Sequence, residues 1–364
     1  MEQLKKTPLF QDHEQLKALL APFGGWEMPI QYSGGIIAEH RWCREQSALF
    51  DICHMGEFLY EGDLEGGGLE GVFTFSVKSI PVGRSRYGFL LNEGGGVIDD
   101  LIVFRLAQEK VMIVVNAATI ANDFRVISSR LAGTANFRDI SDATAKLDLQ
   151  GPEARAVLTR FFGDDLGTLP YFAFRETSLL GVEAIVSRTG YTGELGYELF
   201  LPAGKVQELW ELLLSDPRVK PAGLGARDLL RLEVGYSLYG SDINEVTSPL
   251  EAGLPSFVNF NKEFVGKEVL LGQREAGVSR VKVAFKVDSR RSPRHDYDIY
   301  FQEEKIGSVT SGAFSPMLGC GIGIGFVPPS RAVVGSHLTI RHERVSMEAT
   351  ICDLPFYRDG SVRG

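Results

Sequence analysis

The chain has 364 residues, of which 44% are hydrophobic and 23% charged, and its mean hydropathy is close to zero. This composition is that of a globular protein with enough length for two or three domains and a large core. The net charge is −9 at pH 7, and no segment is rich in lysine and arginine. These features argue against a surface that follows the phosphate backbone of a nucleic acid.

The start of the chain and the cysteines indicate the compartment. The first residues lack the apolar core of a signal peptide, and no apolar run reaches the ~20 residues that span a bilayer. The four cysteines, Cys43, Cys53, Cys320 and Cys352, are far apart in the sequence and form no C-x-x-C pair. We therefore expect reduced thiols in a cytoplasmic protein that has no contact with a membrane.

The first part of the chain mixes short helices, strands and loops. Leucines at 16, 19 and 20 share one helical face, which predicts a short amphipathic helix that ends before Pro22. The predicted elements are, in order, a helix over 14–21, an aromatic and glycine-rich loop over 23–32, a helix over 36–47, a strand over 49–56 and a strand over 87–92.

The segment 66–71 matches G-x-G-x-x-G, but it lacks the strand–helix context and the following acid of a dinucleotide site, so we reject that function.

Three consecutive glycines precede two carboxylates, Asp99 and Asp100, at the start of an apolar run. Glycine and aspartate are common in turns, so a turn into a strand is the simplest interpretation. Strands over 101–106 and 111–116 predict a hairpin, which would bring Asn116 close to the two acids. Strand alternation sends neighbouring residues to opposite faces, and both faces continue with apolar residues, so alternation does not choose between the acids.

The remainder of the chain changes character near residue 276. Before it, helices and strands alternate without a long repeat, which indicates an α+β fold. The predicted elements there are a helix over 121–131, a strand over 145–149, a helix over 152–161, a strand over 184–187, a glycine-rich loop over 188–198, a helix over 205–214 and a helix that begins at 225. Short, closely spaced strands then predict a small all-β barrel or sandwich. These strands are expected over 281–287, 299–302, 305–310, 322–327, 337–341 and 345–352.

The polar residues exclude several kinds of catalysis. The sequence contains no G-x-S-x-G, P-loop or H-E-x-x-H motif, and the six histidines do not cluster at metal-ligand spacing. The remaining candidates are carboxylates and tyrosines in loops beside strands, together with one arginine: Asp99, Asp100, Tyr191, Glu194, Glu198 and Arg227. A carboxylate accepts two parallel N–H bonds from an aminopyrimidinone, so such a set suits a pterin-like ligand. For the arginine, an ordinary solvated side chain remains the alternative.

Many of these segments, in this order, resemble the aminomethyltransferase (T-protein) family of the glycine cleavage system over nearly the whole chain. The matching segments are 7–9, 23–29, 39–40, 49–51, 54–56, 95–100, 115–117, 149–152, 188–194, 225–228, 230–233, 310–312, 315–316 and 355–357. The resemblance implies an α+β fold in which two interleaved, ferredoxin-like folate-binding subdomains surround a central channel. These subdomains would occupy residues 1–275, and a C-terminal all-β barrel domain would occupy residues 276–364.

The resemblance also implies an activity and its partners. The one-carbon unit would pass from the S-aminomethyl-dihydrolipoyl arm of H-protein to tetrahydrofolate, with release of ammonia and formation of methylenetetrahydrofolate in glycine breakdown. Tetrahydrofolate would be the cosubstrate and lipoylated H-protein the protein partner, without a metal, nucleic acid or membrane. Two relatives of this fold are the alternatives: a folate-dependent sulfonium demethylase and a non-enzymatic folate-binding iron–sulfur assembly factor. The latter is expected to carry Lys-Gly-Cys, whereas 264–268 contains no cysteine.

The resemblance assigns roles to particular residues. Asp99 corresponds to the acid beside the reacting folate nitrogens and is the expected catalytic residue. Glu198 corresponds to the carboxylate that binds the pterin, and Arg227 to an arginine that contacts folate. The remaining positions expected in the pocket are Tyr87, Asn116 and Tyr191.

Overall fold

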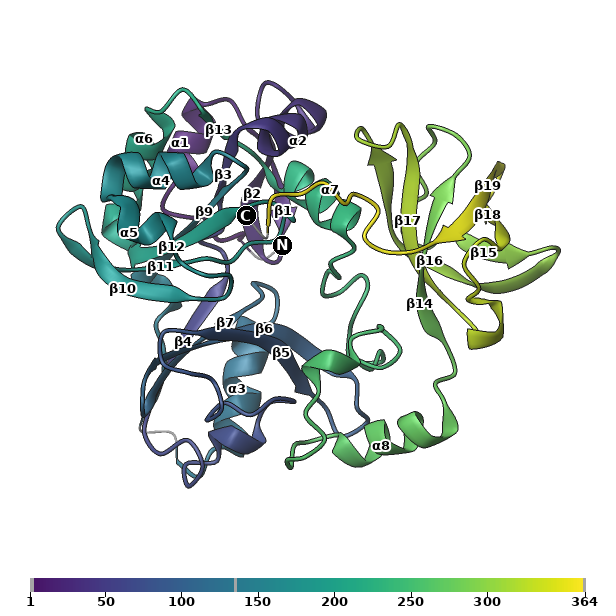
Figure 1. Cartoon of the computed structure of the whole chain (residues 1–364), viewed down its shortest axis with the longest axis horizontal. Coiled ribbons are helices and arrows are strands. Elements are labelled where there is room, and N and C mark those ends of the chain that lie inside the picture. The colour runs from purple at the N-terminus through teal and green to yellow at the C-terminus, as the bar shows by residue number, and fades with distance from the viewer. Residues whose placement is uncertain (1–2, 134–135, 363–364) are drawn as a thin grey trace.

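The computed structural model describes residues 3–133 and 136–362. Figure 1 shows three bodies arranged around a common centre, of which two contain an open sheet and the third is a barrel. The chain builds part of the first sheet, leaves it to build the second, and returns to the first before it enters the barrel. This order confirms an α+β fold with interleaved N-terminal parts and a C-terminal all-β barrel. In the described ranges, no helix is long and apolar enough to cross a membrane.

The first body contains a six-stranded sheet in the order β10-β11-β12-β9-β3-β13. Its strands are β3 (Ser47–Asp51), β9 (Thr144–Gln150), β10 (Phe174–Leu179), β11 (Val182–Ser187), β12 (Gly196–Pro202) and β13 (Val219–Pro221). Its helices are α1 (Phe10–Gln15), α2 (Ile36–Glu45), α4 (Ala154–Phe162), α5 (Asp164–Gly167), α6 (Val206–Leu214) and α7 (Leu224–Val234). The apolar side chains of β9, including Leu147 and Leu149, pack with Trp210 of α6 in one buried core. Hydrophobic burial of this face fixes the register of the strand.

The second body contains a five-stranded sheet in the order β5-β6-β7-β4-β8. Its elements are β4 (Gly56–Glu61), β5 (Ser85–Leu91), β6 (Val97–Ala107), β7 (Lys110–Val115), α3 (Ile120–Arg130) and β8 (Phe137–Asp139). Ile127 of α3 is fully buried against Phe58 and Val103, so this helix covers one face of the sheet. The segment after α7 returns to this body, where Phe264 and Leu270 pack against β5. The helix α8 (Lys267–Ala276) then leads to the barrel.

The third body is a closed barrel in the order β14-β17-β16-β15-β18-β19. Its strands are β14 (Val281–Val287), β15 (Asp298–Phe301), β16 (Glu304–Ser315), β17 (Cys320–Val327), β18 (His337–His342) and β19 (Val345–Cys352). Pairing of β14 with both β17 and β19 closes the barrel and confirms the strands predicted from the sequence. Single-turn 3₁₀ helices occur in connections throughout the chain: η1 (Leu69–Gly71), η2 (Ser141–Ala143), η3 (Ala203–Lys205), η4 (Pro255–Phe257) and η5 (Pro329–Arg331).

The predicted helix over 14–21 and the predicted loop over 23–32 are wrong. The structure instead has the short helix α1, followed by a hairpin of β1 (Leu19–Phe23) and β2 (Trp26–Gln31). Gly24 and Gly25 form the turn with φ values of 56° and 84°, which glycine adopts without strain. The leucine spacing misled the prediction because Leu19 is 58% exposed and does not contribute to a buried helical face.

The glycine stretch before the two acids forms a tight turn, as predicted, but it ends at Gly96. The backbone N–H of Gly96 donates to Oδ1 of Asn92 at 3.0 Å, and a Cβ atom on Gly96 would lie 1.8 Å from the carbonyl oxygen of Glu245. Glycine is therefore required by this close approach. Strand β6 begins at Val97, so both acids lie within the strand.

A buried ionic junction joins the first body to the barrel. Nη1 of Arg44 lies 2.7 Å from Glu194, and its Nη2 lies 2.8 Å from Glu233 of α7. The other oxygen of Glu233 accepts a hydrogen bond of 2.6 Å from the hydroxyl of Ser315 in the barrel. His40 also contacts Glu233, at 2.8 Å. Because these side chains are almost completely buried, each charge depends on its partners.

Glu233→Gln tests this junction. The substitution removes the carboxylate charge that Arg44 and His40 face, and we expect it to lower the free energy of unfolding by about 3–5 kcal/mol. Urea denaturation followed by circular dichroism measures the change. The matched control is Asp298→Asn, which removes the pair of the partly exposed Asp298 with the exposed Lys305 and should leave the denaturation midpoint nearly unchanged. Equal midpoints for the wild type and Glu233→Gln would contradict the role of the junction.

Candidate functional site

Two acids of β6 and the residue after β7 form the first polar centre. The backbone N–H of Asn116 donates to Oδ2 of Asp99 at 2.9 Å. Its side-chain amide donates to Oδ1 of Asp99 at 2.8 Å and to Oδ1 of Asp100 at 2.9 Å. The hairpin prediction is confirmed, because β6 and β7 pair directly and bring Asn116 between the acids. One amide therefore fixes the relative positions of two neighbouring carboxyl groups.

Asp99 lies on the side of the sheet that α3 covers. Its side chain is completely buried, and so is that of Asp123 in α3. Burial, followed by the charge and hydrogen bonding of Asp123, raises the pKa of Asp99 well above its usual value. Burial also raises the pKa of Asp123 to about 7. Two acids so close together cannot both ionise easily, so we interpret them as a pair that shares a proton.

Asp100 lies on the opposite side of the same sheet and is partly exposed. The hydroxyl of Tyr87 in β5 donates to Oδ2 of Asp100 at 2.9 Å. Burial, followed by the charge of Asp99, raises the pKa of Asp100 to about 7. Burial raises the pKa of both Tyr87 and Tyr191. The charge of Tyr191 of the first body raises the pKa of Tyr87 further, and the charge of Asp100 does the same for Tyr191, so the three groups lie near one another. This polar centre therefore lies where the two sheets face each other.

Tyr191 connects this centre to a second one. Its hydroxyl donates to the carbonyl oxygen of Ser237, and its ring is stacked on that of Tyr236 with centroids 5.9 Å apart. The guanidinium carbon of Arg227 lies 5.2 Å from the centre of the Tyr191 ring. Arg227 also forms an ion pair with Asp148 of β9, which is completely buried. The arginine is thus held by the protein itself, with a small part of its side chain still exposed.

Glu198 of β12 is the carboxylate of the second centre. Its Oε2 accepts a hydrogen bond of 2.5 Å from the hydroxyl of Thr189, and its Oε1 lies 3.8 Å from Nζ of Lys146. The side chain is 7% exposed. Glu198 of β12 is paired with Asp148 of β9. The two acids therefore lie next to each other on one face of the sheet. This arrangement leaves lone pairs of the carboxylate available to a ligand with adjacent N–H groups.

The sequence prediction missed the polar side of β9. Lys146, Asp148 and Gln150 alternate with apolar residues, and each of the three is at most 1% exposed. Alternation of this kind normally places the polar side in water. Here the polar side is enclosed between the first and second bodies. The signal was present in the sequence, but alternation alone does not reveal that both faces of a strand are covered.

Two further buried groups beside this row were missed. Burial raises the pKa of Glu57 to about 8 and lowers the pKa of His54 to about 4. Both side chains are therefore mainly neutral at pH 7. Within residues 3–133 and 136–362, neither Oε1 of Glu57 nor Nδ1 of His54 has a hydrogen-bond partner. Such unused polar atoms in the interior are expected where a site takes up a ligand or water.

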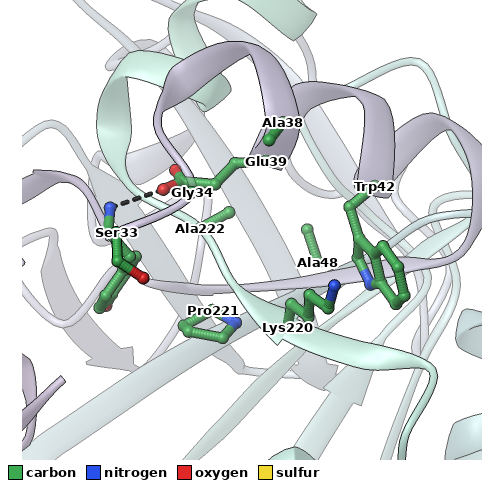
Figure 2. A pocket seen from close by; sticks show the side chains of 10 residues that line it. Ser33, Gly34, Ala38, Glu39, Trp42, Ala48, Lys220, Pro221 and Ala222 are labelled. Carbon is green, nitrogen blue, oxygen red and sulfur yellow. Dashed lines mark hydrogen bonds between the residues drawn. The ribbon is translucent and has the colours of Figure 1, made fainter.

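A separate pocket lies between α2 and β13 (Figure 2) and has a volume of about 340 Å³. Nζ of Lys220 lies 3.4 Å from the centre of the Trp42 ring at one end of it. The Glu39 carboxylate accepts backbone N–H bonds of 2.5 Å and 2.9 Å from Tyr32 and Gly223. The principal acid of this pocket is thus occupied in holding the backbone together. We place the candidate site at the two polar centres described above.

The side chains of the candidate site determine the chemistry that it can support. In the part of the chain that the structure describes, no group of three or more His, Cys, Asp or Glu side chains could hold a metal ion. Asp100 has a pKa suited to accepting and returning a proton near neutral pH. Glu198 can accept two hydrogen bonds from a planar ligand. The geometry therefore supports binding of a planar, polar ligand with proton transfer at its other end.

Two family models match the chain. The "GCVT N-terminal domain" matches residues 9–262, and the "Glycine cleavage T-protein C-terminal barrel domain" matches residues 280–358. An aminomethyltransferase of Halothermothrix orenii is 44% identical, with 97% of this chain and all of the relative covered. One of Thermotoga petrophila is 42% identical, with 99% of each chain covered.

A solved structure leads to the same family. The crystal structure of glycine cleavage system aminomethyltransferase T from Bartonella henselae is similar with a TM-score of 0.91. Its sequence is 34% identical, and the similarity covers 99% of each chain. Both domain types, the sequences of full-length relatives and the complete fold therefore agree. The chain belongs to the aminomethyltransferase (glycine cleavage T-protein) family.

Proposed function

We propose that this protein transfers the one-carbon unit of S-aminomethyl-dihydrolipoyl H-protein to tetrahydrofolate, with release of ammonia and formation of methylenetetrahydrofolate. The observation that carries the proposal is the match to aminomethyltransferases over the whole chain. The paired polar centres support it, because one suits a pterin and the other suits proton transfer. Lipoylated H-protein is the protein partner and tetrahydrofolate the cosubstrate.

In this proposal Glu198 binds the aminopyrimidinone edge of the pterin. Thr189 holds one oxygen of the carboxylate in place, which reduces the conformational freedom lost when the ligand binds. Arg227 and Tyr191 lie between this acid and the acids of β6, so they contact the middle of the folate. Tyr87 and Asn116 orient the acid at the reacting nitrogens.

The structure leads us to propose different tasks for the two acids of β6. The resemblance points to Asp99 as the acid beside the folate nitrogens, yet Asp99 is completely buried on the side of α3. Asp100 is partly exposed on the other side and is the better placed of the two to touch a ligand. We therefore propose that Asp100 contacts the folate, and that Asp99 is a positioning residue that acts through Asn116 and through its proton-sharing pair with Asp123.

The reaction can be written without a covalent enzyme intermediate. The C–N bond of the aminomethyl group breaks and ammonia leaves, while a folate nitrogen forms a new bond to the carbon. The second folate nitrogen then attacks, and the C–S bond breaks to give the dihydrolipoyl thiol. The two folate nitrogens lose one proton each: one proton ends on the thiol and one on the leaving ammonia. Asp100 accepts a proton as carboxylate and can return it to the thiolate. Its charge also stabilises the cationic carbon as ammonia departs.

A direct assay tests the function. Aminomethylated H-protein is incubated with the enzyme, with and without tetrahydrofolate, and ammonia and methylenetetrahydrofolate are measured. We expect tetrahydrofolate to accelerate ammonia release and to yield one methylenetetrahydrofolate for each ammonia. Methyl transfer from a sulfonium compound, without any need for H-protein, would instead identify a demethylase. Binding of folate without transfer from either donor would favour the assembly-factor alternative.

Asp100→Asn and Asp99→Asn separate the roles of the two acids. Loss of the Asp100 carboxylate removes the proton acceptor, so we expect kcat to fall by about 10²- to 10⁴-fold while folate affinity changes little. Asp99→Asn changes a buried acid on the side of the sheet that faces away from the ligand and replaces it with a group of the same shape, so its effect on kcat should be smaller. Steady-state kinetics and equilibrium folate binding measure both. If Asp99→Asn is inactive while Asp100→Asn has normal activity, the catalytic acid is Asp99 and the assignment to Asp100 is wrong.

The pKa of Asp100 predicts a pH dependence. Because the pKa is raised to about 7 and the carboxylate is the active form, kcat/KM should rise with pH through about 7 and level off above it. The rise reports the free enzyme, and it should disappear in Asp100→Asn. Persistence of the same inflection in that variant would assign it to another group.

A further inference from the structure

Lys146 of β9 is a buried lysine that the proposed mechanism does not use. Its side chain is 1% exposed. Among the described residues, its Nζ lies 3.2 Å from the sulfur of Met55, 3.8 Å from Oε1 of Glu198 and 5.1 Å from the centre of the Phe200 ring. A lysine has three N–H donors, a thioether is a weak acceptor, and 3.8 Å is too long for a hydrogen bond. Burial of an amine with so few acceptors is unfavourable unless something else binds there.

Other unused polar atoms surround the same place. Charge interactions show that Glu57 lies near both Lys146 and Glu198, and that His54 lies near Lys146. The free atoms, Oε1 of Glu57 and Nδ1 of His54, are buried without a partner in the described portion of the chain. Glu57 comes from β4, His54 from the turn before it and Lys146 from β9. The polar atoms without a partner therefore lie at the interface between the two sheets. Such an arrangement suits a polar ligand.

The order of hydrogen-bond acceptors and donors on Glu198 and Lys146 indicates which ligand fits between them. Glu198 presents two carboxylate oxygens, and Lys146 presents N–H donors beside Oε1. This is a row of two acceptors followed by a donor. An aminopyrimidinone carries the complementary row, since its 2-amino group and ring N–H are donors and its 4-oxo group is an acceptor. The carboxylate alone accounts for only two of the three positions.

We propose that Lys146 is a specificity-determining residue that donates a hydrogen bond to the 4-oxo group of a pterin held by Glu198. The inference rests on the proposed function in that the ligand is a folate. A 4-amino pterin would place N–H donors against the N–H donors of Lys146. Both groups would then be buried without an acceptor, and the ring nitrogen beside Glu198 would lack its N–H, so the site selects 4-oxo over 4-amino pterins.

A purely structural role predicts something different. If Lys146 only balanced the charge of Glu198, its replacement would weaken 4-oxo and 4-amino ligands to the same extent. If Lys146 contacts the 4-oxo group, its replacement lowers the preference for the 4-oxo ligand, and the preference that remains is due to Glu198, because a 4-amino ring lacks the ring N–H that this carboxylate accepts. The ratio of the two dissociation constants is therefore the informative quantity, and a general loss of affinity does not change it.

The experiment compares tetrahydrofolate with its 4-amino analogue, tetrahydroaminopterin, by equilibrium binding to the full-length protein. We expect the wild type to prefer tetrahydrofolate by at least about tenfold. In Lys146→Met this preference should fall by at least about fivefold. Lys220→Met, in the same sheet but beside Trp42, is the matched control and should keep the wild-type preference. Retention of that preference in Lys146→Met, or an equal loss of affinity for both ligands, would overturn the inference.

Two further measurements complete the test. Lys146→Gln provides a second variant if Lys146→Met does not fold, because its amide can donate to a 4-oxo group or accept from a 4-amino group. It should lower the preference for tetrahydrofolate by at least about threefold. Glu198→Gln should weaken tetrahydrofolate in the wild-type background by at least about tenfold. Failure of the wild type to bind tetrahydrofolate would overturn the proposed function and this inference together. Normal binding with an unaltered preference in both Lys146 variants would overturn the assignment of Lys146 alone.

Discussion

The salt bridges of Arg44 with Glu194 and Glu233 are the interaction on which the arrangement of this protein depends. They bring together α2, the loop before β12 and α7, and Ser315 adds the barrel. The C-terminal segment also returns to this point, where Ser361 donates to Glu194 (Figure 1). Charges buried this deeply are costly unless all their partners are present, so the junction forms only when the first body and the barrel are correctly placed. This requirement favours one relative arrangement of the bodies over others.

The candidate site follows from the interleaved path of the chain. Because the chain leaves the first sheet after β3 and returns at β9, the second sheet is inserted beside it and two polar strand surfaces face each other. Asp100 comes from one sheet and Glu198 from the other, with Tyr191 and Arg227 between them. A long, planar ligand with different chemistry at each end fits such a site. Buried polar groups that would destabilise a simple core are retained where they can bind a ligand.

Local patterns predicted much of this fold. The closely spaced strands indicated the barrel, and the β6–β7 hairpin correctly placed Asn116 beside the two acids. Patterns failed where the deciding contact is distant in sequence. Alternation could not show that α3 covers Asp99, or that the polar side of β9 is enclosed. It also could not show that Asp148 pairs with Arg227, seventy-nine positions away. The hairpin at Gly24 was missed because leucine periodicity outweighed a two-glycine turn. The family resemblance supplied the folate and the H-protein, which the residues alone left open.

We propose that the two polar centres form one folate site, with Glu198 and Lys146 at the pterin and Asp100 at the reacting nitrogens. A crystal structure of the protein with bound tetrahydrofolate tests it most directly. We expect the 2-amino and ring N–H groups on Glu198, the 4-oxo group on Lys146, and a reacting nitrogen within hydrogen-bond distance of Asp100. A folate bound elsewhere, such as the pocket beside Trp42, or one whose reacting nitrogens lie away from Asp100, would contradict it.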